Sequence, residues 1–399
     1  MLCGVESFDV FVVKLSKYLG EYIIIYRDSD RFILLNDAAA QHQIFYDTSY
    51  AVFGSQPKLL CEIVTPEHHT CPNAIEFYSS IMFQKHKDFI YDTTHLKNVK
   101  HLLPNHYIDV LGKSVIRFFP KEPLVIKPIK DVAPQAVKML KGYIKSIGLR
   151  KSIVIPFTAG YDSRVLFLSS LEENCSYFVY KNTTDNRYDI TIPKKIAKYY
   201  NKDFEVVSLL DTFEDCGDSI DFPRKTKKRG KYFMDSIYLF GTVSEIVRNI
   251  YGYRRNVSAN ELSTLLGYRN FKPAISIIDT WLKETKHLET KGYNILDMFY
   301  LDYRLGIWSA KSKTELRAIG LDAISPFNSR DLLIMLLSTP RKDRDYYNNN
   351  LFDALLKELS PQSLDFPINP CFSRSLRKLT SKLGIYDSIK WMALKYGLA

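Results

Sequence analysis

The sequence predicts an α/β protein in which a β-rich N-terminal part precedes a parallel sheet with a mostly helical C-terminal part. Two observations lead to this class. Short apolar runs separated by polar turns dominate residues 21–110, whereas residues 153–207 alternate strand-like and helix-like segments. The chain of 399 residues is also long enough for two domains.

The N-terminal part contains a predicted β-hairpin. Residues 21–26 and 31–35 are apolar runs that flank the polar turn Asp28-Ser29-Asp30. Further short strands are expected around residues 44–46, 51–53 and 107–110. Seven of the 8 histidines precede residue 107, but they lack metal-ligand spacing, so we interpret them as structural.

A proline-marked connection at residues 119–128 divides the chain into two predicted domains, residues 1–127 and 128–399. The elements expected next are a helix at 132–147, a strand at 153–157, a helix at 165–171, a strand at 177–180, a helix at 190–200 and a strand at 204–207. This alternation predicts a parallel sheet covered on both faces, which binds ligands at the carboxyl ends of its strands.

The remainder, from about residue 232, is expected to be mostly helical and ends in a basic amphipathic segment, residues 373–396. Such a segment either lies on a membrane surface or packs on its own domain, and we favour packing. No run approaches the roughly 20 apolar residues of a membrane span. The N-terminus lacks a basic segment followed by an apolar run, so no signal peptide is expected.

The composition is typical of a globular protein, and the positive net charge suits an acidic partner. Hydrophobic residues make up 46%, and the net charge is +11, which suits ATP, tRNA, an anionic glycan or a membrane surface. The basic run at residues 224–231 is interpreted as a solvated loop, with a lid over polyphosphate as the alternative. The 6 cysteines form no Cys-x-x-Cys pair, which favours a reduced, cytoplasmic protein without a zinc site.

The most informative stretch lies at residues 153–164. The apolar strand ends in Thr158-Ala159-Gly160-Tyr161-Asp162-Ser163-Arg164, and a helix then begins. A strand, loop and helix in this order present backbone N–H groups and a helix N-terminus to an anion. The loop is similar to the Ser-Gly-Gly-x-Asp-Ser signature of PP-loop ATP pyrophosphatases, which cleave ATP between its α- and β-phosphates.

The whole chain resembles the asparagine synthetase family, in which a glutaminase domain of the Ntn type precedes a PP-loop synthetase domain. The resemblance rests on blocks in the family's order over about 310 residues. These blocks are residues 19–28, 36–46, 52–60 and 103–107 in the first half, and residues 158–163, 241–245 and 324–332 in the second, with Asp189 where the family has an acidic residue.

The resemblance implies an ATP site and an Mg²⁺ site. Thr158, Ala159, Gly160, Tyr161, Asp162, Ser163 and Asp189 would bind ATP, and Asp162 and Glu245 would hold Mg²⁺. Arg164 would stabilise the leaving group, with a surface or helix-capping role as the alternative. Asp162 could instead cap the helix that follows it. Arg248, Arg254 and Arg255 could bind an anionic substrate or could be exposed helix charges.

Several positions depart from the family's pattern. Cys3 is not the first residue after Met1, and the glutamine-binding segments have no room, so we expect a truncated domain without glutaminase activity. Ser244 stands where the family has a metal-binding Asp. The late catalytic lysine has no clear counterpart, and Lys311, Lys313 and Arg341 are replacements without positional support.

The leading hypothesis is therefore an AMP-forming amide ligase that adenylates a carboxylate and transfers it to ammonia or a substrate amine. ATP, the carboxylate and the amine would be its partners, and a homodimer is left open. A tRNA- or nucleobase-modifying PP-loop enzyme is the second hypothesis, and no DNA partner is expected. A non-catalytic binding protein is the third, because the loop, the acidic motif and the lysine are all altered.

Overall fold

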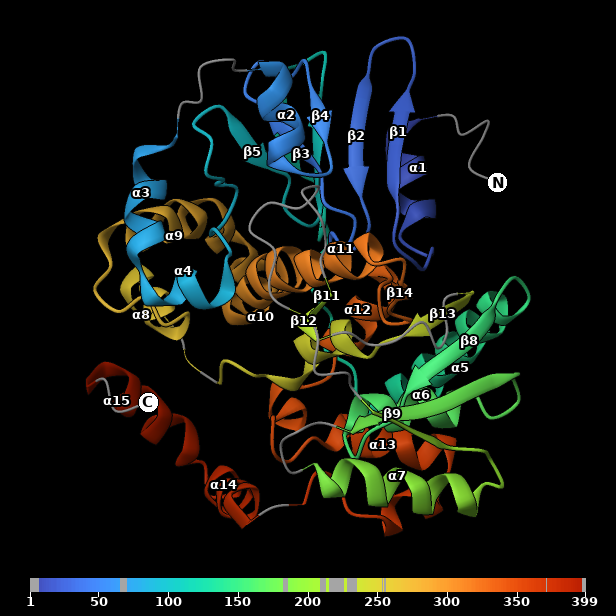
Figure 1. Ribbon diagram of the computed structural model, residues 1–399. Coiled ribbons are helices and arrows are strands. Elements are labelled where there is room, and N and C mark those ends of the chain that lie inside the picture. Colours follow the sequence, from blue (N-terminus) through green and yellow to red (C-terminus); the bar gives the residue numbers. More distant parts are fainter. Residues whose placement is uncertain are drawn as a thin grey trace.

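The computed structural model describes residues 7–64, 70–181, 186–208, 213–214, 226–227, 235–252, 254, 256–370 and 372–396. It is a mixed α/β structure with a five-stranded parallel sheet and several antiparallel sheets (Figure 1), which confirms the predicted class at this level. Cys3, Arg255 and most of the basic run at 224–231 lie outside the described residues.

The first antiparallel sheet contains the predicted hairpin. Its strands are β1(Ile23–Arg27), β2(Phe32–Asn36), β6(His106–Asp109) and β7(Ser114–Arg117), in the order β1-β2-β6-β7. The Asp28 carboxylate accepts the backbone N–H groups of Asp30 and Arg31, at 2.9 and 2.7 Å, which closes the turn. Helix α1(Phe8–Leu15) packs its buried side chains against this sheet.

A second sheet, in the order β4-β3-β5, lies against the other face of the first. Its strands are β3(Phe45–Asp47), β4(Phe53–Gly54) and β5(Val99–His101). Side chains from both sheets form one core, which includes Leu34, Tyr46 and Ile108. The expectation of a β-rich half named no helices, but the described residues also form α2(Pro57–Val64), α3(Pro72–Ser79) and α4(Ile81–His86).

The parallel sheet has the strand order β10-β9-β8-β13-β14. Its elements, in chain order, are α5(Ile129–Gly148), β8(Ser152–Pro156), α6(Tyr161–Ser169), β9(Cys175–Lys181), α7(Arg187–Tyr199), β10(Glu205–Ser208), β13(Ser236–Leu239) and β14(Asp322–Ile324). The chain moves outward from β8 to β10 and then returns to the other side of β8. The strand order therefore reverses between β8 and β13, where sheets of this class bind ligands.

The rest of the described chain is helical, as expected. Its helices are η1(Thr242–Arg248), α8(Ala259–Leu265), α9(Lys272–Thr285), η2(Lys286–Lys291), α10(Ile295–Phe299), η3(Tyr300–Ser309), α11(Ala310–Ala318), α12(Arg330–Leu337), η4(Arg341–Arg344), α13(Asn350–Leu359), η5(Pro361–Asp365), α14(Phe372–Lys382) and α15(Tyr386–Tyr396). Helices α10, η3 and α11 follow one another without a break, and η3 is wound as a π-helix. This long helix crosses the middle of the molecule, between the N-terminal sheets and the parallel sheet (Figure 1).

The C-terminal segment contacts its own chain through α15. Trp391 is buried, and the Lys390 ammonium donates to the carbonyl of Ile250 at 2.7 Å. Several apolar side chains of α14 and α15 nevertheless remain exposed, among them Leu376, Leu379 and Met392. Over the described ranges, every helix is too short or too polar to cross a bilayer.

Buried polar contacts join the two halves. Glu21 pairs with Lys313 at 3.0 Å and with Arg317. The fully buried Arg330 donates to the Asn105 side chain, to the Tyr22 hydroxyl and to the carbonyl of Asn36, at 2.8–2.9 Å. These contacts position the N-terminal half directly against the helices that follow the parallel sheet.

Candidate functional site

The predicted anion-binding loop connects β8 to α6 at the point where the strand order reverses. The helix begins at Tyr161, earlier than the predicted residue 165, and its N-cap Gly160 provides no side-chain acceptor. Ser163 Oγ accepts the Thr158 N–H at 3.1 Å and lies 3.0 Å from Thr158 Oγ1. The loop is thus folded on itself by its own hydroxyl groups, and no side chain among the described residues caps the first turn of α6.

Asp189 reaches the loop from the first turn of α7. Its carboxylate accepts the Ala159 N–H at 3.0 Å, which fixes the middle of the loop. Ala159 is not among the described residues with positive φ, so alanine fits there without backbone strain. The structure therefore brings Thr158, Ser163 and Asp189 together around one turn of chain.

Asp162 lies at the centre of a small polar cluster beside this loop. The Ser244 hydroxyl donates to its Oδ1 at 3.0 Å, and Arg248 Nη1 donates to its Oδ2 at 2.8 Å. The backbone at Gly241 approaches so closely that an added Cβ would lie 2.4 Å from the Asp162 Cβ. Glycine is required here because the two loops that end β8 and β13 are in contact.

The two residues expected to hold Mg²⁺ both make contacts with other side chains of this chain. Both oxygens of Asp162 are engaged, one of them by the buried guanidinium of Arg248. Glu245 Oε2 accepts a hydrogen bond from the Tyr300 hydroxyl at 2.6 Å. Within the described ranges, no group of three or more His, Cys, Asp or Glu residues is placed to hold a metal. Arg248 forms the ion pair with Asp162, at 2.8 Å.

Arg164 lies away from the loop's anion-binding side. Its buried guanidinium donates to the backbone carbonyls of Ser363, Phe366 and Pro367, at 2.7–2.8 Å. Burial lowers the pKa of this guanidinium to about 10, so it remains charged at neutral pH. The geometry does not place Arg164 as a stabiliser of a leaving group. It places Arg164 as an anchor for the segment that follows α13.

A cavity of about 510 Å³, here called the loop cavity, borders the start of α6. Its lining includes Tyr161, Tyr347, Asp353, Asn369 and Lys378. The Tyr161 hydroxyl donates to Asp353 Oδ1 at 3.0 Å, and the Asn369 N–H donates to the carbonyl of Ala159 at 3.1 Å. This volume lies within the range of about 300–1,000 Å³ that is typical of small-molecule sites.

Lys378 supplies a cation that sequence reasoning missed. It lies on α14, is exposed and lines the loop cavity. The three replacements considered for the late lysine lie elsewhere. Lys311 pairs with Asp88 at 3.6 Å, Lys313 pairs with Glu21, and Arg341 donates to Asn249. The positive charge that most directly faces this cavity therefore comes from a segment without any recognised motif.

A second cavity of about 510 Å³, here called the aromatic cavity, begins at Glu245. Burial, and then the negative charge of Asp162, raise the pKa of the Glu245 carboxyl. The cavity is lined by Tyr251, Tyr300, Tyr303, Trp308 and Tyr346, with Arg304, and by Met82 and His86 from the N-terminal half. Arg248 separates it from the loop, because its guanidinium pairs with Asp162 and lies 4.8 Å from the Tyr346 ring centroid.

Of the other two predicted arginines, the structure describes Arg254. Arg254 pairs with Glu261 and lies over the Trp391 ring, 4.8 Å from its centroid, so it holds α15 against α8. Arg255 lies outside the described residues.

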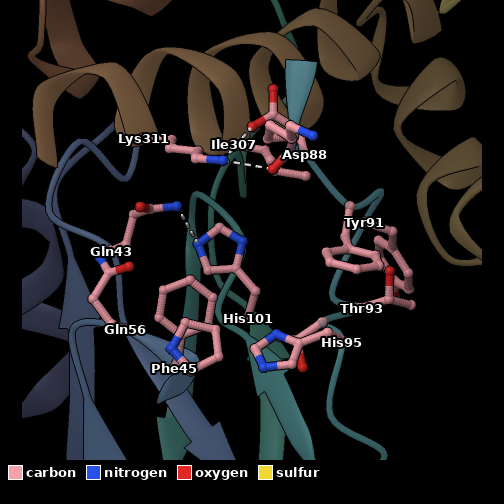
Figure 2. Close-up of a pocket in the computed structure, with 14 residues that line it drawn as sticks. Gln43, Phe45, Gln56, Asp88, Tyr91, Thr93, His95, His101, Ile307 and Lys311 are labelled. Atoms are coloured by element: carbon pink, nitrogen blue, oxygen red, sulfur yellow. Dashed lines mark hydrogen bonds and ion pairs between the residues drawn. The ribbon is translucent and has the colours of Figure 1, made fainter. Parts of the chain in front are cut away.

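A smaller pocket of about 60 Å³ lies between the N-terminal half and the long central helix (Figure 2). Figure 2 shows His101 between Gln43 and Phe45, with Lys311 reaching toward Asp88. The His101 ring stacks on Phe45 with centroids 4.7 Å apart, and burial lowers the pKa of its imidazole to about 3. A neutral, buried histidine agrees with the structural interpretation of this residue, and the pocket has room for about two water molecules.

Comparison of the sequence with protein-family models gives no match, and comparison with curated proteins gives none either.

Proposed function

We propose that this protein binds ATP at the loop between β8 and α6 and uses it to activate a carboxylate for amide formation. One observation carries the proposal: an uncapped helix N-terminus follows Gly160 at the reversal of strand order, beside a cavity of about 510 Å³. Backbone N–H groups and the helix dipole favour phosphate at such a place.

The reaction class is the one that the resemblance to the asparagine synthetase family implies. A carboxylate oxygen would attack the α-phosphorus of ATP, pyrophosphate would leave, and an acyl-adenylate would form. Attack by an amine nitrogen on the acyl carbon then forms the C–N bond, while the C–O bond to AMP breaks. Two separate cavities, one beside the start of α6 and one that begins at Glu245, suit a reaction that joins two substrates. Lys378 adds positive charge for the phosphates.

The test has two steps: the first measures ATP binding without any other substrate, and the second measures catalysis. ATP is titrated into the full chain by calorimetry, and ATP–pyrophosphate exchange is then measured with pools of carboxylates. Ser163→Ala removes the hydroxyl that organises the loop, and we expect it to weaken ATP binding by about tenfold, since it removes hydrogen bonds that hold the loop. Ser276→Ala, an exposed position on α9, is the matched control and should bind ATP like the wild type.

A non-catalytic nucleotide-binding protein is the second candidate, and the Asp162–Arg248 pair favours it. A guanidinium occupies the side of Asp162 that the resemblance assigned to Mg²⁺, so the carboxylate is already neutralised. Under this candidate, ATP binds to the wild type but no carboxylate gives exchange. Exchange that depends on a carboxylate decides for the ligase.

A further inference from the structure

The aromatic cavity combines three kinds of chemistry in its lining. Its aromatic walls include Tyr251, Tyr300 and Tyr303, its one carboxylate is Glu245, and its guanidinium is Arg304. The N-terminal half closes one side with Met82 and His86. Cavities of this size are typical of small-molecule binding.

Glu245 presents an acceptor to the cavity. Its Oε2 is taken by the Tyr300 hydroxyl, and the side chain, which is partly exposed, lines the cavity with the Tyr251 and Tyr300 rings 5.4 Å apart beside it. A carboxylate among aromatic faces favours an organic ammonium, which can donate to the carboxylate and lie over the rings. This wall therefore selects a positive charge.

Arg304 presents the opposite preference. Its guanidinium lies over Trp308, 3.4 Å from the ring centroid, and the described part of the chain supplies it with neither an ion pair nor a hydrogen bond. A planar guanidinium held against an aromatic ring is well suited to bind a carboxylate through two parallel hydrogen bonds. This wall therefore selects a negative charge.

The backbone that carries these groups is itself unusual. Tyr300, Tyr303, Arg304 and Trp308 all lie on the ten-residue π-helix η3. The wider turn of a π-helix is rare, and single π-helical turns within α-helices are frequently found at functional sites. In the same helix, an added Cβ at Gly306 would lie 2.5 Å from Pro104, so the N-terminal half packs directly behind it.

We propose that the aromatic cavity binds a zwitterionic L-amino acid with an apolar or aromatic side chain. The ammonium faces Glu245, the carboxylate faces Arg304, and the side chain lies against the aromatic and apolar walls. Binding of the amino acid needs no ATP. Its role as the amine substrate rests on the proposed function.

In that role, the amino acid meets the acyl-adenylate at the boundary formed by Arg248. The ammonium loses one proton to water, its nitrogen attacks the acyl carbon, and the C–N bond forms. The C–O bond to AMP breaks, AMP leaves with the electron pair, and the second proton leaves the nitrogen for water. The products are an N-acyl amino acid and AMP.

Three probes separate the two charged contacts. L-phenylalanine carries both groups, phenethylamine lacks the carboxylate, and 3-phenylpropanoate lacks the ammonium. We expect calorimetry on the full chain, without ATP, to show that L-phenylalanine binds at least tenfold more tightly than either analogue. Equal affinity for the three probes, or no binding of L-phenylalanine at 10 mM, overturns the proposal. A dissociation constant of about 10 mM corresponds to a binding free energy of about 3 kcal/mol.

Paired variants provide the second measurement. Arg304→Gln should weaken L-phenylalanine at least tenfold and leave phenethylamine unchanged, while Arg304→Lys should keep part of the affinity. Glu245→Gln should weaken L-phenylalanine and leave 3-phenylpropanoate unchanged. Arg269→Gln is the control, because this exposed arginine does not line the cavity. If Arg304→Gln weakens phenethylamine and L-phenylalanine equally, the assigned orientation is wrong.

ATP binding in the same samples distinguishes the two proposals. If ATP binds and no amino acid does, the assignment of the cavity fails and the nucleotide site stands. If L-phenylalanine binds with the expected pattern and ATP does not, the cavity assignment stands and the proposed function fails.

Discussion

Two buried ion-pair clusters in this molecule have similar chemistry and different surroundings. The cluster of Glu21 with Lys313 and Arg317 lies between the two halves, and none of its members lines a cavity described above. The pair of Asp162 and Arg248 lies at the end of the parallel sheet, between the loop and the aromatic cavity. Burial of charge alone therefore does not identify a functional site. Proximity to space for a ligand separates the second cluster from the first.

The largest effect is expected at the interface between the halves. Glu21→Ala leaves the buried Lys313 without its carboxylate, so the free energy of unfolding should fall by about 3–5 kcal/mol. Denaturant unfolding of the full chain measures this change. Asp279→Ala, which breaks an exposed pair with Lys283, should cost no more than about 0.5 kcal/mol. Equal losses for the two variants would contradict a structural role for the Glu21 cluster.

A different outcome is expected when the second cluster is broken. Arg248→Gln leaves Asp162 as an unneutralised carboxylate beside the loop, so ATP should bind at least tenfold more weakly, a change of about 1.4 kcal/mol or more. Arg344→Gln breaks a similarly buried pair with Asp297 that borders none of the described cavities. Where this control stays folded, its affinity for ATP should match the wild type, and a parallel loss would remove the distinction between the clusters.

The smaller pocket of the N-terminal half should respond to pH. Burial holds the pKa of His101 at about 3, whereas an unfolded histidine titrates near 6.5. The unfolded chain therefore binds a proton that the folded chain does not, and His101 destabilises the fold as pH falls below about 6.5. Its contribution between pH 7.5 and 5.5 should be about 1.4 kcal/mol.

His101→Gln provides the comparison for this pH effect. The difference in unfolding free energy between wild type and variant should shift in favour of the variant on going from pH 7.5 to 5.5. Phe45 and Gln43 still pack beside the new amide. A loss of stability that is the same at every pH does not alter the slope of the stability difference against pH. A difference that stays constant with pH would show that the His101 imidazole titrates alike in the folded and the unfolded chain, which contradicts a lowered pKa in the fold.

The smallest effect is expected at Lys378. This exposed lysine lines the loop cavity without a close ion pair among the described residues, so solvent screens its charge. Lys378→Gln should weaken ATP binding by about two- to fivefold, and the difference should shrink as salt is raised. Lys357→Gln, on the neighbouring α13 but outside the cavity lining, is the control. A loss that persists at high salt would indicate direct contact with the phosphates.

Local sequence was sufficient for three strands of the parallel sheet, β8, β9 and β10, and for the loop, whereas β13 and β14 lie in the part that was expected to be mostly helical. Alternating strands and helices placed the loop correctly after β8, and the acidic residue at the start of α7 does contact it through Ala159. Contacts between segments that are distant in the chain could not be predicted from the sequence. Arg164 binds carbonyls about 200 residues away, at Ser363 and beyond, so its pairing depends on where the chain returns. The spacing of Asp162 and Arg248 likewise gave no sign of their pairing.

The aromatic cavity could not be found from the sequence for the same reason. Its walls include residues of α4, of η1, of the turn after α8 and of η3. The sequence of each segment alone is typical of a hydrophobic core. The signal that was present is the density of aromatic residues between residues 299 and 308, which periodicity assigns to a buried helix. Only the fold shows that these rings surround a space.

Calorimetric titration of ATP into the full chain tests the central claim most directly. The account predicts saturable binding of one ATP per chain that Ser163→Ala and Arg248→Gln weaken by about tenfold or more and that Ser276→Ala leaves unchanged. Absence of binding with and without Mg²⁺, or binding that all three variants retain in full, would contradict the assignment of the nucleotide to this loop.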